Sequence, residues 1–365
     1  MKLLSVVGAR PQFIKVAALA HSLEAEAKNI KHLIVHSGQH YDYFMSRIFL
    51  NQLRIPKVNY YLNVGSASHA VQTAEILKRV EVVLIKEKPD WVVVYGDTNT
   101  TLAAALAAAK LNLPIAHVEA GLRSFDRSMP EEINRVLVDR VAGLLFTPSP
   151  EANSNLLREG ISRAKIHFVG NVMIDTLVNL LPKAEERWGQ LKRRFAVSGF
   201  ILVTLHRPSN VDDSKTLRNI IRALKILAKR TPVIFPVHPR TRKMAESNRL
   251  INLSREKGLH LIRPLGYLDF LSLEKHASLV LTDSGGIQEE TTFLGVPCLT
   301  LRPNTERPIT VTLGTNKLIK SRSKDIVSAV NASLRYRHRN LKPKLPALWD
   351  GNSSKRIVDV IKRNS

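Results

Sequence analysis

Acidic side chains follow two short apolar runs, at places where a parallel sheet exposes the ends of its strands. Asp97 comes after Trp91–Tyr95, and Glu119 comes after Ile115–Val118. If these strands are neighbours, both carboxylates reach one crevice, where like charges separate their proton affinities into those of an acid and a base. The second run is too short to leave Glu119 deep in the core. Asp97 also suits a helix N-cap, which is the alternative explanation for its position.

Further residues suited to proton transfer occur elsewhere in the chain. Glu131 begins a helical segment, where a glutamate ordinarily complements the helix dipole. In the second half, His206 with Arg207 follows one apolar run, and His238 follows the next. Imidazole is the side chain best matched to proton transfer near pH 7. The pattern indicates acid–base chemistry by side chains from several strand ends.

A glycine-rich turn gives the strongest local signal. Ser284-Gly285-Gly286 lies between an apolar run and a helical segment. Amide groups at a helix N-terminus bind phosphate, and only glycine permits so close a backbone approach. Glu290 follows within that helix, where it either accepts ribose hydroxyls or lies on a solvated face. The segment predicts a nucleotide-binding turn.

Cationic side chains accompany these turns. Arg10 and Lys15 follow the first apolar run, Leu3–Val7, near the start of a helix. Arg307 lies shortly after the last predicted strand. A cation near a helix N-terminus favours an anionic ligand, although an arginine in such a loop is often only a surface residue.

The elements that position these residues alternate between apolar runs and segments of helical period, which is typical of parallel sheets with crossover helices. Such helical segments include His69–Lys86, Thr98–Lys110 and Lys215–Lys229. We predict an α/β protein of two doubly wound Rossmann-like domains facing a cleft. The first, residues 1–175, carries the carboxylates, and the second, residues 176–365, binds the nucleotide. The last helix is expected to pack back on the first domain.

Composition limits the classes of function. The 365 residues carry a formal net charge of +24, which suggests nucleic acid. However, no aromatic residues alternate with the basic residues after Lys317, so a solvated surface or an anionic metabolite explains the charge better. The single cysteine, Cys298, fits a reducing compartment. No apolar run approaches the roughly 20 residues of a membrane span, nor does the first run suit a secretory signal. We therefore expect a cytoplasmic protein with no membrane or nucleic-acid partner.

Taken together, the motifs resemble one family, the non-hydrolysing UDP-N-acetylglucosamine 2-epimerases. The matching segments run in the family's order over nearly the whole chain: Gly8–Pro11, Gly96–Thr98, His117–Arg123, Pro130–Glu132, His206-Arg207, Pro236–His238, Asp283–Glu290 and Thr305–Pro308. The resemblance implies a fold like B-type glycosyltransferases and a homodimer. It implies conversion of UDP-N-acetylglucosamine to UDP-N-acetylmannosamine without metal or nicotinamide, by elimination and re-addition of UDP.

The resemblance also implies roles for individual residues. Asp97, Glu119 and Glu131 would act on the proton at carbon 2, and His206 would assist the departing diphosphate. The diphosphate contacts would be Arg10, Lys15, Ser284, Gly285, Gly286 and Arg307. Glu290 resembles the ribose ligand, and Phe270 resembles a residue that lines the uracil pocket.

Some positions depart from the family pattern. Ser209 and Ile309 stand where many relatives carry glutamate. In bacterial relatives a second substrate molecule activates the enzyme, and Gln39, Arg207 and His238 match that site. Asp42 stands where those relatives have glutamine.

Three other functions remain open at this point. A glycosyltransferase of the same architecture would share the nucleotide-binding half but would not need three carboxylates around the sugar. A hydrolysing epimerase, which releases N-acetylmannosamine and UDP, is not distinguished by residue spacing. A nucleic-acid-binding protein is suggested by charge alone.

Overall fold

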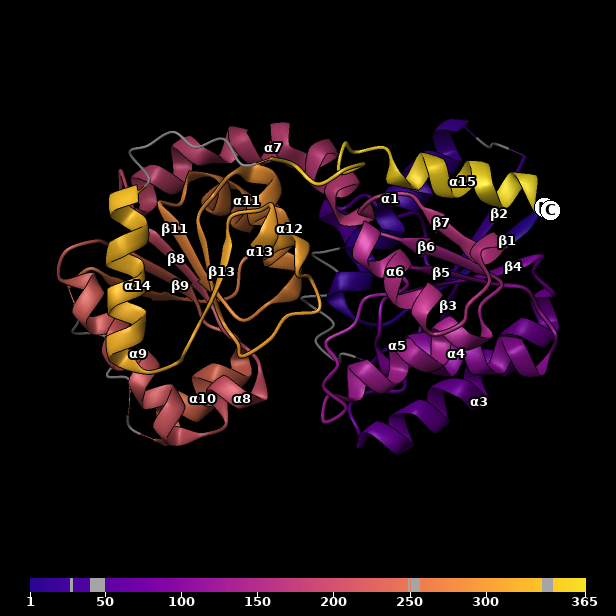
Figure 1. Cartoon of the computed structure of the whole chain (residues 1–365), viewed down its shortest axis with the longest axis horizontal. Coiled ribbons are helices and arrows are strands. Elements are labelled where there is room, and N and C mark those ends of the chain that lie inside the picture. The colour runs from indigo at the N-terminus through magenta and orange to yellow at the C-terminus, as the bar shows by residue number, and fades with distance from the viewer. Residues whose placement is uncertain (27–28, 40–49, 249, 251–256, 337–343) are drawn as a thin grey trace. The chain divides into compact units, whose positions relative to one another are not determined.

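The chain forms two compact units, each built around its own parallel sheet (Figure 1). The computed structural model describes residues 1–26, 29–39, 50–248, 250, 257–336 and 344–365. Unit 1 consists of Met1–Asn179 and Ala347–Ser365, and unit 2 consists of Leu180–Pro346. The expected domain boundary lies near residue 175, and the units divide within the long helix α7 (Val172–Phe195).

Unit 1 contains a seven-stranded parallel sheet in the order β3-β2-β1-β4-β5-β6-β7. Its strands are β1 (Lys2–Val7), β2 (Lys31–His36), β3 (Tyr60–Tyr61), β4 (Trp91–Tyr95), β5 (Ile115–Val118), β6 (Leu144–Thr147) and β7 (Ile166–Phe168). The sheet forms because apolar runs such as Trp91–Tyr95 are buried along their whole length, as strands covered on both faces require. The helices are α1 (Arg10–Glu26), α3 (His69–Glu87), α4 (Asn99–Lys110), α5 (Pro130–Val141) and α6 (Pro150–Arg158), with the 3₁₀ turn η1 (Arg163–Lys165).

The last helix of the chain, α15 (Ser353–Arg363), belongs to unit 1 and packs against α1 (Figure 1). The carboxylate of Asp175 caps it, accepting hydrogen bonds from the backbone amides of Ser353 at 3.1 Å and Ser354 at 2.6 Å. Upstream, the indole nitrogen of Trp349 donates to the carbonyl of Pro148 at 3.0 Å. These contacts tie the end of the chain to the first sheet.

Unit 2 contains a six-stranded parallel sheet in the order β10-β9-β8-β11-β12-β13. Its strands are β8 (Ile201–Thr204), β9 (Val233–Pro236), β10 (Leu259–Ile262), β11 (Leu279–Thr282), β12 (Cys298–Leu301) and β13 (Asn316–Ile319). Its helices are the second part of α7, then α8 (Pro208–Val211), α9 (Ser214–Ala228), α10 (Pro239–Ser247), α11 (Tyr267–His276), α12 (Gly285–Leu294), α13 (Ile309–Thr312) and α14 (Ser323–Tyr336). The helix α9 packs its apolar face on this sheet through Leu217, Ile220 and Leu224.

The order of strands reverses once in each sheet, between β1 and β4 and between β8 and β11. Ligands of open parallel sheets bind outside the carboxyl ends of the strands at such a reversal. The predicted α/β class of two doubly wound sheets is confirmed. Strands β3 and β13 were not predicted: β3 has only two residues, and β13 is an edge strand that is only partly buried and includes Asn316 and Lys317, so neither forms an apolar run. Among the described residues, none of the helices is long and apolar enough to cross a bilayer.

Candidate active site

Glu119 stands directly after β5 and is paired with a buried lysine. Val118 pairs with Tyr95 in the parallel register of β4 and β5, so Glu119 leaves the same sheet edge as Asp97. The carboxylate of Glu119 forms an ion pair with the ammonium of Lys15, from α1, and the two side chains are 5% and 4% exposed. The prediction that Glu119 lies outside the core was wrong. The carboxylate is buried because the ammonium of Lys15 is buried beside it and compensates its charge.

The backbone of Glu119 is strained. Its φ angle of 72° lies in the left-handed region that ordinarily favours glycine. The carbonyl of Phe146 holds the turn in place, accepting hydrogen bonds of 3.0 Å from the amides of Glu119 and Ala120. Such conformations cost about 1–3 kcal/mol and cluster at active sites.

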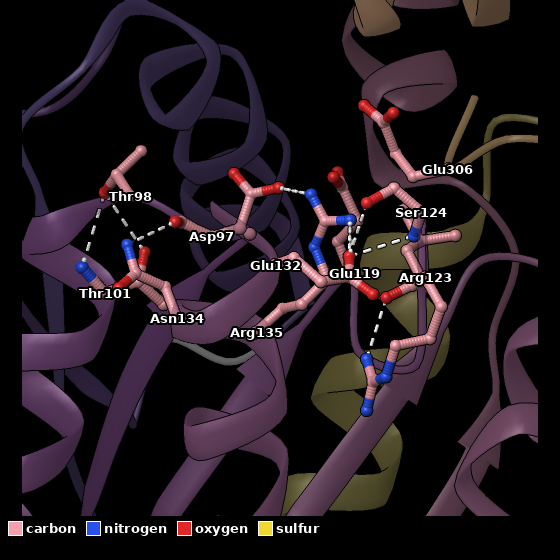
Figure 2. Close-up of polar contacts among 12 residues, drawn as sticks. Asp97, Thr98, Thr101, Glu119, Arg123, Ser124, Glu132, Asn134, Arg135 and Glu306 are labelled. Carbon is pink, nitrogen blue, oxygen red and sulfur yellow. Dashed lines mark hydrogen bonds and ion pairs between the residues drawn. The ribbon is translucent and has the colours of Figure 1, made fainter. Parts of the chain in front are cut away.

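Asp97 follows β4 and is held by a second buried cation (Figure 2). Nη2 of Arg135, on α5, donates to Oδ2 of Asp97 at 2.5 Å. The helix N-cap of α4 is Thr98, whose side chain accepts a hydrogen bond from the amide of Thr101 at 3.3 Å. The N-cap explanation for Asp97 is therefore wrong, and its carboxylate is 26% exposed at the strand end.

The two glutamates at the start of α5 have different environments. Glu132 is 4% exposed and accepts a hydrogen bond from Nη1 of Arg135 at 2.7 Å. Glu131, which sequence analysis selected, is partly exposed in the first turn of α5. Its role at the sugar stays a prediction, whereas Glu132 and Arg135 were missed. The three-residue spacing of Glu132 and Arg135 on a helix was the signal that could have identified them.

Beneath the two strand ends lies a buried polar network that sequence analysis also missed. The ring of His117, in β5, contacts the Asp139 carboxylate at 2.7 Å and the carbonyl of Gly96 at 2.8 Å. Arg123 bonds the other oxygen of Asp139 at 2.8 Å, and the amide of Gly121 donates to the same oxygen at 3.1 Å. The network therefore braces the turns that carry Asp97 and Glu119.

In unit 2, Asp283 organises the turn after β8. Its carboxylate accepts from the backbone amides of His206 at 3.2 Å and Arg207 at 3.0 Å, and lies 3.2 Å from Nδ1 of His206. Burial opposes ionisation of Asp283, but the His206 ring, Asn210 and the Arg207 amide together lower its pKa below the ordinary 3.8. The His206 side chain is 43% exposed. With Nδ1 directed at the carboxylate, Nε2 is the nitrogen left for an exogenous group.

The glycine-rich turn lies against a cluster of charged groups. Ser284 is the N-cap of α12, and Gly285 begins that helix. Arg307 contacts the carboxylates of Glu306 at 2.5 Å and Glu289 at 2.9 Å.

Two more arginines share Glu306. Nη2 of Arg302 lies 2.7 Å from one oxygen of Glu306, and Nη2 of Arg207 lies 3.7 Å from the other. Burial favours the neutral carboxyl, but these guanidinium groups and that of Arg307 outweigh it and hold the pKa of Glu306 well below 4.5. Three guanidinium groups therefore lie together beside the N-terminus of α12, and guanidinium groups with free helix amides suit a phosphate.

Glu290 is buried with a hydrogen-bonded tyrosine. It is 2% exposed, so the alternative of a solvated helix face is wrong. The hydroxyl of Tyr267 donates to Oε1 of Glu290 at 2.8 Å. Glu274, which is 0% exposed, lies against it, and burial together with the charge and hydrogen bond of Glu290 raises the pKa of Glu274 well above 4.5. Phe270, expected beside uracil, is 7% exposed and packs in the core of unit 2.

The residues that match a regulatory site divide between the units. Gln39 belongs to unit 1, where its side-chain oxygen accepts from the amide and hydroxyl of Thr100 at 3.1 and 2.7 Å. Arg207 and His238 belong to unit 2, where the rings of His206 and His238 are 6.1 Å apart. Asp42 lies outside the described residues. Arg10, the remaining predicted contact, is exposed at the start of α1.

Comparison with known proteins decides the family. The family described as UDP-N-acetylglucosamine 2-epimerase matches residues 22–362. The chain belongs to the UDP-N-acetylglucosamine 2-epimerase family. The family member from Methanocaldococcus jannaschii is 46% identical over 371 residues, which cover 99% of each chain. A Pseudomonas aeruginosa relative, a UDP-2,3-diacetamido-2,3-dideoxy-D-glucuronate 2-epimerase, is 46% identical over 337 residues and 92% of each chain.

Solved structures of UDP-N-acetylglucosamine 2-epimerases share the fold. The M. jannaschii enzyme in complex with UDP-GlcNAc and UDP has a TM-score of 0.92 at 46% identity, with all of both chains covered. The Neisseria meningitidis enzyme bound to UDP-GlcNAc has a TM-score of 0.90 at 34% identity, again over both whole chains. The chain therefore has the B-type glycosyltransferase-like fold of this epimerase family, as the motifs implied.

Proposed function

We propose that the protein interconverts UDP-N-acetylglucosamine and UDP-N-acetylmannosamine without hydrolysis. The observation that supports this most directly is the register of β4 and β5, which sends Asp97 and Glu119 from one sheet edge, each with a buried cation. Chemistry at carbon 2 needs a base that removes a proton and an acid that returns one to the opposite face. Family membership and the UDP-GlcNAc complexes of relatives support the same substrate.

In the proposed reaction, a carboxylate of unit 1 takes the proton from carbon 2. The electron pair of that bond forms a double bond to carbon 1, and the bond from carbon 1 to oxygen breaks as UDP leaves. Return of a proton to the other face of carbon 2 and attack of UDP on carbon 1 complete the inversion. Asp97, Glu119 and Glu131 are the proposed carboxylates: the first two follow β4 and β5, and Glu131 lies in the first turn of α5.

Unit 2 is proposed to bind the nucleotide. The N-terminus of α12 with Ser284, Gly285 and Gly286 would hold the diphosphate, because free amides and the arginine cluster both favour an anion there. Glu290 would accept the ribose hydroxyls with the carboxylate that Tyr267 orients. His206 would stabilise the departing diphosphate through Nε2, and Arg10, Lys15, Arg307 and Phe270 are proposed substrate contacts.

A homodimer in the cytoplasm is part of the proposal. Apolar side chains are exposed on two helices of unit 1 that both pack against α4, namely Val82 and Ile85 on α3 and Ile133 and Leu137 on α5. Exposed apolar surface of this kind suits a protein interface. Light scattering on the purified protein tests the dimer, and Val82→Glu with Ile85→Glu should produce monomers.

Gln39, Arg207 and His238 are proposed to bind a second, activating substrate molecule. This is tested by whether UDP-GlcNAc accelerates its own formation from UDP-N-acetylmannosamine.

Proton NMR in heavy water tests the reaction. Incubation with UDP-N-acetylglucosamine alone should remove the carbon 2 proton signal and produce two UDP-sugars. Free N-acetylmannosamine with UDP would instead identify a hydrolysing epimerase. An unchanged substrate that turns over only with an acceptor would identify a glycosyltransferase, and salt-dependent nanomolar binding of nucleic acid without sugar turnover would identify the non-enzymatic alternative.

A second sugar is suggested by the P. aeruginosa relative, which is named for a diacetamido-glucuronate substrate. Its reaction is also a 2-epimerisation, so the same carboxylates would serve both substrates. Supplying the two UDP-sugars in competition decides between them, since the preferred substrate has the larger kcat/KM.

A further inference from the structure

Arg135 is a buried arginine that joins two carboxylates (Figure 2). It is 2% exposed, and its guanidinium contacts Oδ2 of Asp97 at 2.5 Å and Oε2 of Glu132 at 2.7 Å. The Asp97 side chain keeps 26% of its surface exposed. The cation is therefore enclosed by the protein, while the Asp97 carboxylate remains accessible.

Glu132 is fixed from its other side. Its Oε2 accepts hydrogen bonds from the amide of Ser124 at 2.9 Å and the hydroxyl of Ser124 at 2.8 Å, and its Oε1 accepts from the amide of Phe125 at 2.9 Å. These contacts hold Phe125 at a φ of 56°, a left-handed conformation that a non-glycine residue adopts only under constraint. Glu132 is thus immobilised by the turn after β5, and it immobilises Arg135 in turn.

The geometry of arginine suits this bridge. A planar guanidinium directs separate N–H groups at two acceptors, and it stays charged at any pH at which the protein folds. A cation within hydrogen-bonding distance favours the ionised form of a carboxylate. A group that exchanges a proton with a substrate must also be held at reacting distance.

We propose that Arg135 is a positioning residue for the epimerisation: it holds the Asp97 carboxylate ionised and in place, and Glu132 fixes the guanidinium. This inference rests on the proposed function, in which Asp97 acts at carbon 2 of the sugar. Arg135 itself need not contact the substrate.

The variants Arg135→Met, Arg135→Lys and Glu132→Gln test the role. Arg135→Met should lower kcat about 100-fold, the scale of one acid–base group, with KM changed by no more than about threefold because ground-state binding is intact. The acidic limb of its kcat–pH profile should move to higher pH, since Asp97 then protonates more easily. Arg135→Lys should recover part of kcat and keep the acidic limb near its wild-type position, because the cation is retained. Glu132→Gln should show a smaller loss of kcat than Arg135→Met, because the guanidinium stays charged but is held less firmly.

A matched control removes another Arg–Asp pair of unit 1. Arg356 contacts Asp350 at 2.5 Å and the carbonyl of Val169 just after β7, two strands from β5, so Arg356→Met should keep the wild-type kcat and pH profile. Wild-type kcat in Arg135→Met, a loss confined to KM, or an unmoved acidic limb would overturn the proposal. If Arg135→Met does not fold, wild-type kcat in both Arg135→Lys and Glu132→Gln overturns it equally.

Failure of the proposed function and failure of the Arg135 role give different results. Wild-type protein that does not exchange the carbon 2 proton of UDP-N-acetylglucosamine contradicts the proposed function itself. Wild-type protein that exchanges this proton, together with an unimpaired Arg135→Met variant, contradicts only the role of Arg135.

Discussion

A Cβ atom on Gly285 would lie 2.4 Å from Nη1 of Arg307, closer than side chains ever approach. The first residue of α12 must therefore be glycine for Arg307 to reach Glu306 and Glu289. The backbone turn and the arginine cluster depend on each other at this point.

Gly285→Ala should weaken binding of UDP more than it destabilises the fold. The displaced group is the end of a flexible side chain, so Arg307 moves aside at about 1–2 kcal/mol, equivalent to about tenfold in the dissociation constant. Titration calorimetry with UDP measures this. Gly189→Ala in α7 is the control, because its Cβ would meet only Nη1 of Arg193, at 3.8 Å. Equal UDP affinity in both variants would contradict the prediction.

Removal of the Lys15 ammonium should be strongly destabilising. Lys15→Met removes the ammonium that is ion-paired with the buried Glu119 carboxylate, at a cost of about 3–5 kcal/mol in the free energy of unfolding. Adding Glu119→Gln should recover most of that loss, because no buried charge then remains. Urea denaturation of the wild type, both single variants and the double variant measures the coupling, and additive losses would show that the pair does not interact.

Glu306 should make the protein sensitive to acid. Its pKa is held well below 4.5 in the folded protein, mainly by Arg307, Arg302 and Arg207 acting against burial. The stabilisation is therefore present above about pH 4.5 and is lost as the pH falls through the folded value. Unfolding free energies measured from pH 6 to 3 should fall more steeply for the wild type than for Glu306→Gln. Parallel curves would show that Glu306 titrates normally.

Glu274 should make the protein less stable as the pH rises, which is opposite to the effect of Glu306. Burial, with the charge and hydrogen bond of Glu290, raises its pKa well above 4.5. Its contribution to stability is present below about pH 4.5 and is lost as the pH rises through the folded value. Glu274→Gln keeps a hydrogen-bond donor without an ionisable proton. The melting temperature of this variant should therefore rise relative to that of the wild type as the pH increases from 5 to 8. A constant difference across that range would contradict this.

Asp175 should hold the last helix on unit 1. The N-cap residue of α15, Asn352, makes no side-chain cap bond, and Asp175 from α7 caps the helix instead. Asp175→Ala should therefore cost about 1–2 kcal/mol, the usual loss for a missing cap, and increase hydrogen exchange in residues 353–363. Asp350→Ala, which removes a partly exposed ion pair, should cost about 0–1 kcal/mol. Unchanged exchange in α15 would contradict the capping role.

The sequence by itself determined the α/β class, most of the strands and the turns that carry Asp97, Glu119, His206 and Ser284. Apolar runs of strand length are read from local pattern, and a polar residue after such a run must lie at a strand end. The sequence did not reveal the buried cations that pair with Glu119 and Asp97. Lys15 and Arg135 come from helices distant in sequence, and only the packing of α1 and α5 on the sheet brings their charges to Glu119 and Asp97.

The tertiary structure also decided which of two adjacent glutamates is buried. Glu131 and Glu132 look equivalent in the sequence, but one turn of α5 leaves the first partly exposed and buries the second against Arg135. Nothing in the sequence around Glu274 indicates its raised pKa, because that pKa depends on burial and on Glu290 from another helix. Local pattern fixes where a side chain leaves the backbone, whereas its charge state depends on neighbours that only the folded chain supplies.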